Sequence, residues 1–206
     1  MTSREIDPGS TRRQHILTDR EGTEALLALG ANLPGPAGPP RAAVEAALER
    51  LARQVGPLKV SRLFETPAFP PGSGPPFVNG CASVRWDGEA EALLARLHDV
   101  EAALGRTRAG RWEPRAIDLD LIAVGPAVAP DPPTQDAWRG LPPDRQRVLR
   151  PDRLVLPHPR LQDRAFVLVP LLDIAPDWRH PRTGRSVREM VAALDSADRE
   201  AVRPIR

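Results

Sequence analysis

Several features that other proteins depend on are scarce or missing in this sequence. A single cysteine, Cys81, excludes an internal disulfide and fits a reducing compartment. Tyrosine is absent and Lys59 is the only lysine, so arginine carries nearly all of the positive charge. No apolar run approaches the roughly 18 residues of a membrane span, and the N-terminus is polar where a signal peptide would be apolar. We therefore expect a cytoplasmic protein without a membrane partner.

The overall charge argues against a protein dedicated to nucleic acid. The 206 residues include 29 basic and 27 acidic side chains, a formal net charge of +2. Such a balance gives no general attraction to a phosphate backbone or an anionic membrane, so we expect no nucleic-acid partner. The informative charge is local, because residues 106–115 hold four arginines against Glu113.

Hydrophobic periodicity predicts strands and helices in the order βαββαβ. Alternating or continuous apolar runs indicate strands, and apolar residues at helical spacing indicate helices. The expected strands are 23–29, 58–66, 77–86 and 117–122, and the expected helices are 39–55, 89–104 and, near the C-terminus, 187–194. This order predicts an α+β, ferredoxin-like core, an antiparallel sheet with its helices on one face, followed by a C-terminal extension. The other face would be free for a ligand.

The same reading divides the chain into a domain and two tails. Residues 1–22 alternate in charge without periodicity, and we expect a disordered tail. Residues 23–195 form the predicted domain, and residues 196–206 a basic tail. Within the domain, about 125–152 read as a polar, proline-rich insert with no obvious core.

The chemistry concentrates where an arginine-rich loop runs into the strand at 117–122. Asp118 and Asp120 share one face of that strand, because residues two apart in a strand point the same way. Two adjacent carboxylates would repel each other unless a cation lay between them, and carboxylates beside bound phosphates suit Mg²⁺. The loop arginines would hold the phosphates. For the two aspartates alone, a solvated face of an edge strand is the competing interpretation.

Two further places are candidates for binding. Phe77 and Asn79 share a face of the third strand, where a ring stacks on a flat heterocycle and an amide reads its donors and acceptors. Phe77 as an ordinary core residue is the alternative. His158 lies between two prolines in a stiff, extended backbone that suits a donor to phosphate, and a structural histidine is the alternative.

With these residues assembled, the sequence resembles the hydroxymethyl-dihydropterin pyrophosphokinases of folate biosynthesis. The similarity covers about residues 26–176, and its motifs are specific. They lie at residues 29–33 (LGANL), 64–67 (FETP), 77–79 (FVN), 111–120 (RWEPRAIDLD), 157–158 (PH) and 164–166 (RAF). The sequence departs from the family pattern at Ala31, Ala68 and Glu113, and by the long insert.

The resemblance implies an enzyme that moves pyrophosphate from ATP to the hydroxymethyl group of 6-hydroxymethyl-7,8-dihydropterin and releases AMP. It implies two Mg²⁺ ions on Asp118 and Asp120, ATP as co-substrate and a small-molecule site; we also expect a monomer. A ferredoxin-like RNA-binding module and a small-molecule-sensing module are the non-catalytic alternatives.

The resemblance also assigns individual roles. Arg106, Arg115, Asp118 and Asp120 would be catalytic. The expected ATP-binding residues are Glu101, Arg106, Arg108, Arg111, Arg115, Arg153, His158 and Arg164. The expected pterin-binding residues are Thr66, Pro67, Ala68, Phe69, Phe77, Asn79, Trp112 and Phe166.

Overall fold

One antiparallel sheet organises the chain. The computed structural model describes residues 22–68, 72, 74–106 and 116–206. Within these residues the sheet has six strands, in the order β5-β1-β4-β3-β6, with β2 also paired to β4. The strands are β1 (Thr23–Ala31), β2 (Lys59–Val60), β3 (Phe64–Thr66), β4 (Phe77–Trp86), β5 (Asp118–Val124) and β6 (Arg203–Pro204). The predicted βαββαβ core is confirmed.

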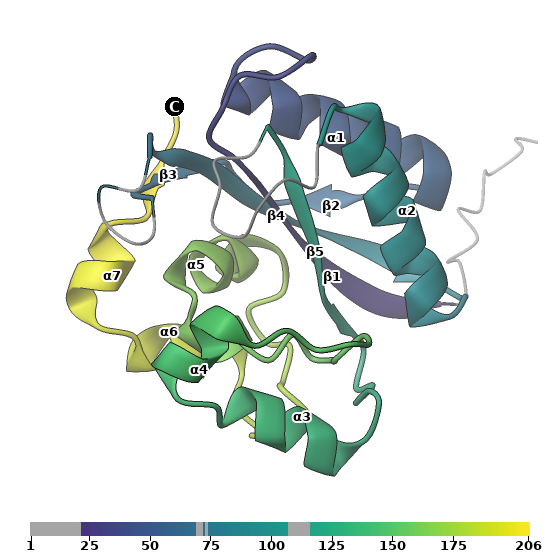
Figure 1. Cartoon of the computed structure of the whole chain (residues 1–206), viewed down its shortest axis with the longest axis vertical. Helices are drawn as coiled ribbons and strands as arrows, with labels where there is room; N and C mark the ends of the chain where they lie inside the picture. Colours follow the sequence, from purple (N-terminus) through teal and green to yellow (C-terminus); the bar gives the residue numbers. More distant parts are fainter. Residues whose placement is uncertain (1–21, 69–71, 73, 107–115) are drawn as a thin grey trace, which may run out of the picture.

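Two long helices cover one face of the sheet. They are α1 (Pro40–Val55) and α2 (Ala90–Ala103), and Figure 1 shows them side by side on that face. Proline at the first position of α1 sets a helical φ, and Gly56 ends the helix with a positive φ of 95°. Both helices bury apolar side chains against Leu27 and Leu29 of β1. This layer is the one that the periodicity predicts.

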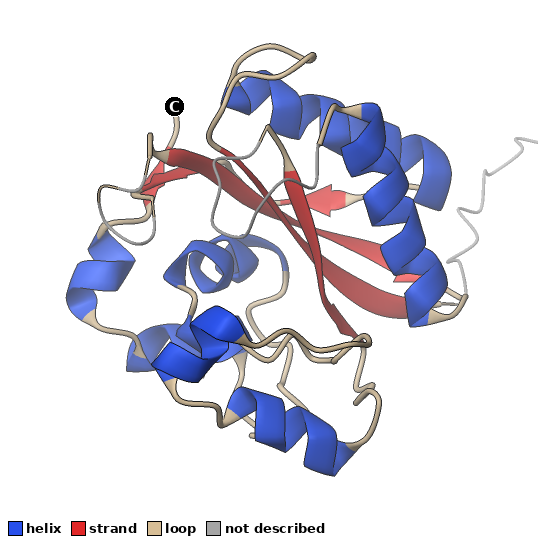
Figure 2. Cartoon of the chain, viewed as in Figure 1, coloured by secondary structure: helices blue, strands red, loops and turns tan. Residues whose placement is uncertain are grey.

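The second face was expected to be free, and here the expectation is wrong for much of its area. Helix α5 (Ala165–Ile174) packs on β4, and α6 (Val187–Ala193) packs on α5 (Figures 1 and 2). The reason lies in the strands, because Leu26, Ile122 and Cys81 present a second apolar surface that must be buried.

Two polar contacts hold the C-terminal half of α5 against the strands. Lys59 donates its ammonium to the carbonyl of Ile174, one of the carbonyls that a helix end leaves without a partner. Arg62 forms a two-pronged ion pair with Asp173, at 2.8 and 2.9 Å. These contacts fix the helix whose first turn carries Arg164 and Phe166.

Two sequence expectations differ from the observed strands. The strand expected at 58–66 is interrupted between β2 and β3, where the Ser61 hydroxyl accepts the Cys81 N–H at 2.9 Å and donates to the Arg62 carbonyl at 2.7 Å. These side-chain bonds divert the ladder locally. Strand β1 runs on through Gly30 to Ala31, beyond the end expected at residue 29.

The C-terminal third is more ordered than its composition suggests. The insert contains α3 (Pro132–Arg139) and α4 (Pro143–Val148), a 3₁₀ turn spans Leu161–Asp163, and α7 (Ser196–Glu200) follows α6. The basic tail expected at 196–206 instead forms α7 and β6, because β6 pairs with β3 and completes that sheet edge. Among the described residues, no helix is long and apolar enough to cross a membrane.

We predict that the α5 layer is essential for stability. Leu168 is completely buried between α5 and the sheet, so Leu168→Ala should lower the free energy of unfolding by about 2–5 kcal/mol. Leu172→Ala, at a partly buried position of the same helix, should cost clearly less. Urea unfolding of both variants measures the difference, and equal small losses would contradict the role of this layer.

Candidate active site

The register of three strands sets the candidate site. Gly30 of β1 lies opposite Asp118 of β5 on one side and opposite Asn79 of β4 on the other. A carboxylate and an amide are therefore separated across the sheet by a residue with no side chain. Asp120 lies one step further along the same face, opposite Ala28. The site occupies the end of the second sheet face at which β5 begins.

Gly30 is required here for space. A Cβ at this position would lie 2.5 Å from Oδ1 of Asn79 and 3.8 Å from the ring of Phe77. The first distance is far below van der Waals contact, so the missing side chain is what admits Asn79 to this face. The strand expected from the sequence ended at residue 29, and the motif at residues 29–33 gave no indication of this steric role.

Asp118 is bound into a charged network that begins in α2. Arg106 forms an ion pair with Oδ1 of Asp118 at 2.8 Å and also contacts Oε1 of Glu101. The same Glu101 oxygen accepts the Leu119 N–H of β5 at 2.7 Å. Glu101 thus fixes both the arginine and the strand that carries the aspartates.

Burial gives Glu101 unusual acid–base behaviour. Its residue is only 2% exposed, and this desolvation raises the pKa of its carboxyl to about 7, against the opposing pull of the Leu119 N–H and the Arg106 charge. The sequence assigned Glu101 only to the neighbourhood of ATP. Its contact with the β5 backbone depends on how α2 docks, which no local pattern encodes.

Asp120 has its own arginine, from the other layer. Arg164, directly before α5, places its guanidinium 3.4 Å from Oδ2 of Asp120 and 5.5 Å from the ring centroid of Phe166. The two aspartates are therefore neutralised from two different elements. Their side chains remain 27% and 38% exposed, so both stay accessible to solvent and ligands.

His158 is held beside these charges by its backbone. Its N–H donates to the Ile122 carbonyl of β5 at 2.7 Å, and its Nδ1 accepts the Arg160 N–H at 3.1 Å. Burial, followed by the nearby charges of Arg164 and Arg160, lowers the pKa of this imidazole well below 6.5. The ring is thus neutral near pH 7, with its proton on Nε2, which makes it a donor without charge.

Some of the expected pterin-binding residues lie close together. The buried amide of Asn79 donates to the Thr66 hydroxyl at 2.7 Å, and Ala68, two residues after Thr66, is also buried. Phe77 is half-buried and Pro67 is exposed. Asn32, for which the sequence analysis gave no binding role, donates to the Pro75 carbonyl at 3.2 Å and so ties the end of β1 to the loop before β4.

The remaining expected residues lie elsewhere or outside the described part. Arg153 is 63% exposed and pairs with its neighbour Asp152 at 3.0 Å, and within the described residues it makes no ion pair with the other expected site residues. Five expected residues are outside the described range: Phe69, Arg108, Arg111, Trp112 and Arg115.

Among the described residues, the paired aspartates are the candidate place for a metal, with help from a ligand. No group of three or more histidine, cysteine, aspartate or glutamate side chains in the described ranges is arranged to hold an ion. Two carboxylates on one strand face are the type of incomplete site that waters and phosphate oxygens complete around Mg²⁺.

A ferredoxin-like sheet with paired carboxylates, converging arginines and a half-buried ring defines a phosphate-transferring enzyme. The chain belongs to the 7,8-dihydro-6-hydroxymethylpterin-pyrophosphokinase (HPPK) family, whose model matches residues 26–176.

Relatives in sequence agree with this family. Two proteins named 2-amino-4-hydroxy-6-hydroxymethyldihydropteridine pyrophosphokinase are each 36% identical to the chain. The one from Synechocystis sp. aligns over 83% of this chain and 76% of its own length. The one from Methylorubrum extorquens aligns over 87% of this chain and 99% of its own length.

Solved structures of similar shape support the fold. The HPPK-DHPS of Plasmodium falciparum superimposes with a TM-score of 0.56 at 14% sequence identity in its wild-type form. The match covers 82% of this chain and 44% of that chain, so the present chain spans less than half of the larger protein.

We predict that Glu101 makes stability depend on pH. Its folded-state pKa of about 7 exceeds the ordinary 4.5, so its contribution to stability is present below about pH 4.5 and is lost as the pH rises to about 7. Glu101→Gln lacks this loss and should therefore gain stability relative to wild type over that interval. Urea unfolding across the interval measures it, with the exposed Glu91→Gln as control for surface charge. A constant difference between wild type and Glu101→Gln would contradict the prediction.

Proposed function

We propose that the chain transfers the pyrophosphoryl group of ATP to the hydroxymethyl group of 6-hydroxymethyl-7,8-dihydropterin, with AMP as the second product. The observation that carries the proposal is the strand register, in which Gly30 separates Asp118 from Asn79. This register supports the proposal, because the carboxylates that would hold metal and phosphate and the amide that would read a heterocycle share one sheet face without an intervening side chain. This is the arrangement that a transfer between two bound molecules requires.

Asp118 and Asp120 are the residues that would hold two Mg²⁺ ions. Their shared face, their partial exposure and the absence of a third acidic ligand among the described residues fit a cation that keeps oxygen positions for phosphate. The bound ions would supply charge neutralisation of the phosphates and a lowered pKa for the attacking hydroxyl. Among the described residues, Arg106 and Arg164 pair with these carboxylates, and both would contact phosphate oxygens when cations take their place.

We assign the triphosphate to the charged residues around this pair. Arg106 follows α2 and Arg164 directly precedes α5, and neutral His158 would donate from Nε2. The roles of Arg108, Arg111 and Arg115 at the phosphates remain part of the proposal. Arg153 is its weakest member, because its described partner is Asp152.

The pterin occupies the neighbouring part of the same face. Asn79 reads its polar edge, Phe77 and Phe166 stack on its two sides, and residues 66–69 with Trp112 close the pocket. Asn79 is held by Thr66, so the amide is fixed before the ligand arrives, which limits the entropy lost on binding.

The reaction then needs no covalent intermediate on the protein. The pterin oxygen forms a bond to the β-phosphorus of ATP, the bond from that phosphorus to the oxygen bridging to the α-phosphate breaks, and AMP leaves with the electron pair. The hydroxyl proton passes to solvent. The residues position the two substrates and neutralise charge, which is the main demand of phosphoryl transfer. A cytoplasmic monomer completes the proposal.

A non-catalytic nucleic-acid module is the alternative that the experiment must separate. Incubation with ATP, Mg²⁺ and the pterin alcohol should give AMP and the pterin diphosphate in equal amounts, and omission of the pterin should abolish AMP. A protein that binds RNA and produces no AMP would overturn the proposal.

The first prediction of this section concerns the carboxylates. Asp118→Asn and Asp120→Asn should each lower kcat by about 1,000-fold or more, because each removes charged metal ligation worth several kcal/mol in the transition state. Circular dichroism should show an unchanged fold, and Asp87→Asn at an exposed turn is the matched control. Full activity of both variants at saturating Mg²⁺ would remove the metal site from the proposal.

The second prediction concerns Gly30, which lies between Asp118 and Asn79 in the sheet. Gly30→Ala introduces a Cβ 2.5 Å from Oδ1 of Asn79, so the amide must rotate away from its Thr66 partner. The dissociation constant for the pterin should rise by about tenfold or more, on the scale of one lost polar contact, while that for an ATP analogue changes little. Calorimetry with each ligand separates the two, and equal losses for both would show general distortion.

A further inference from the structure

The insert at 125–152 contacts the backbone segment that carries His158. Ala129 and Leu156 exchange both backbone hydrogen bonds, each at 3.0 Å, so the insert runs beside the segment that leads to His158. One residue after Leu156, the Pro157 carbonyl accepts a hydrogen bond from the side-chain amide of Gln135 at 3.2 Å. The N–H of the same peptide unit belongs to His158 and donates to Ile122 of β5.

Both polar groups of the peptide that carries His158 are therefore held, one by the sheet and the other by the insert. A carbonyl only accepts, so Gln135 must present its NH₂ group, and no other orientation of the amide satisfies the contact. Gln135 is completely buried, which is uncommon for glutamine and makes the bond inaccessible to competing water.

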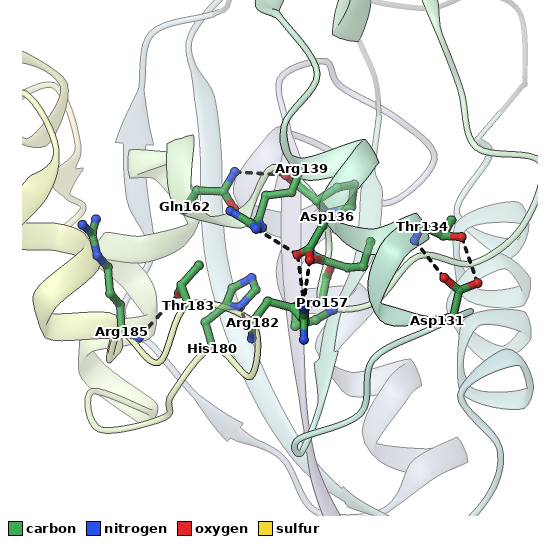
Figure 3. Close-up of polar contacts among 12 residues, drawn as sticks. Asp131, Thr134, Asp136, Arg139, Pro157, Gln162, His180, Arg182, Thr183 and Arg185 are labelled. Carbon is green, nitrogen blue, oxygen red and sulfur yellow. Dashed lines mark hydrogen bonds and ion pairs between the residues drawn. The ribbon is translucent and has the colours of Figure 1, made fainter.

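Helix α3 is itself fixed at both ends. Asp131 caps its N-terminus by accepting the Thr134 N–H at 2.8 Å. Near its other end, Asp136 lies between Arg139 at 2.9 Å and Arg182 at 2.6 Å, as Figure 3 shows. Arg182 comes from the loop between α5 and α6, so the insert is anchored to a distant part of the chain. Because α3 is held in place, a side chain on it can fix the position of the Pro157 carbonyl.

We propose that residues 125–152 position His158 for its ligand, and that Gln135 is the positioning residue through which they act. This rests on the proposed function, in which His158 binds the nucleotide phosphates. Because Nδ1 of His158 is tied to the Arg160 N–H, the ring is fixed relative to its own backbone. Any shift of the 157–158 peptide therefore moves Nε2 by a comparable distance, and a hydrogen bond to phosphate tolerates little displacement.

A double-mutant cycle tests the inference. Gln135→Met keeps the length and volume of the side chain and removes its donor, and Gln146→Met is the matched control on α4 of the same insert, where Gln146 bonds within the insert to Leu141. The dissociation constants of a non-hydrolysable ATP analogue with Mg²⁺ and of the pterin are measured by calorimetry. These are determined for wild type, both variants, His158→Ala, and His158→Ala combined with Gln135→Met.

We expect Gln135→Met to raise the nucleotide dissociation constant about 3- to 10-fold and to leave the pterin constant unchanged. In the His158→Ala background the same substitution should add nothing, because the residue through which it acts is gone. Gln146→Met should leave both constants unchanged. An equal loss in both backgrounds, or a matching loss of pterin affinity, would overturn the inference in favour of a purely structural role.

Hydrogen exchange separates this inference from the proposed function. Exchange of the His158 amide should be faster in Gln135→Met than in wild type, and an unchanged rate would overturn the positioning role. If His158→Ala leaves nucleotide affinity unchanged, the role of His158 in the proposed function fails, and the exchange rate alone then decides whether Gln135 positions the peptide.

A second variant covers the case in which Gln135→Met does not fold. Arg182→Met releases α3 from the loop between α5 and α6 while Gln135 stays in place. It should weaken nucleotide binding in the same direction by a smaller factor, and again only when His158 is present. Unchanged nucleotide affinity together with an unchanged exchange rate of the His158 amide would count against the proposal.

Discussion

The structure depends on compensating two carboxylates that stand on one face of a strand. Asp118 and Asp120 would repel each other across this face. Two arginines from separate layers compensate their charges, Arg106 beside α2 and Arg164 before α5. Each arginine must in turn be held, the first by buried Glu101 and the second by the packing of α5. Elements on opposite faces of the sheet are therefore both joined to strand β5 by ion pairs.

The sequence predicted what local patterns encode. Alternation and helical spacing placed β1, β4, α1 and α2 close to their observed bounds, and the spacing of the aspartates predicted their common face. It failed where distant segments decide the outcome. The second apolar face of the strands required α5 as a cover, and the interruption at Ser61 depends on Cys81 twenty residues later. Gln135 could not be identified, because one glutamine in a polar, proline-rich segment looks like surface until its partner, a backbone carbonyl, is known.

Helix α5 shows how packing and chemistry are combined in one element. Its buried side chains close the second core, while the residues at its start carry a guanidinium and a ring toward the sheet. The fold as a whole is shared with the larger HPPK-DHPS chain in its wild-type form at a TM-score of 0.56 and only 14% identity. A fold can persist at such low identity because burial constrains the polarity and volume of side chains more strongly than their identity.

The contact between Lys59 and the end of α5 has a practical consequence for chemistry on this protein. Lys59 is the only lysine in the sequence, so it offers the sole side-chain primary amine to acylating reagents. That amine is engaged with the Ile174 carbonyl, and acylation would remove both its charge and its ability to cap the helix. Dyes, crosslinkers and immobilisation supports that react with side-chain amines would therefore modify a residue that secures α5, whereas coupling through an introduced surface thiol would leave it intact.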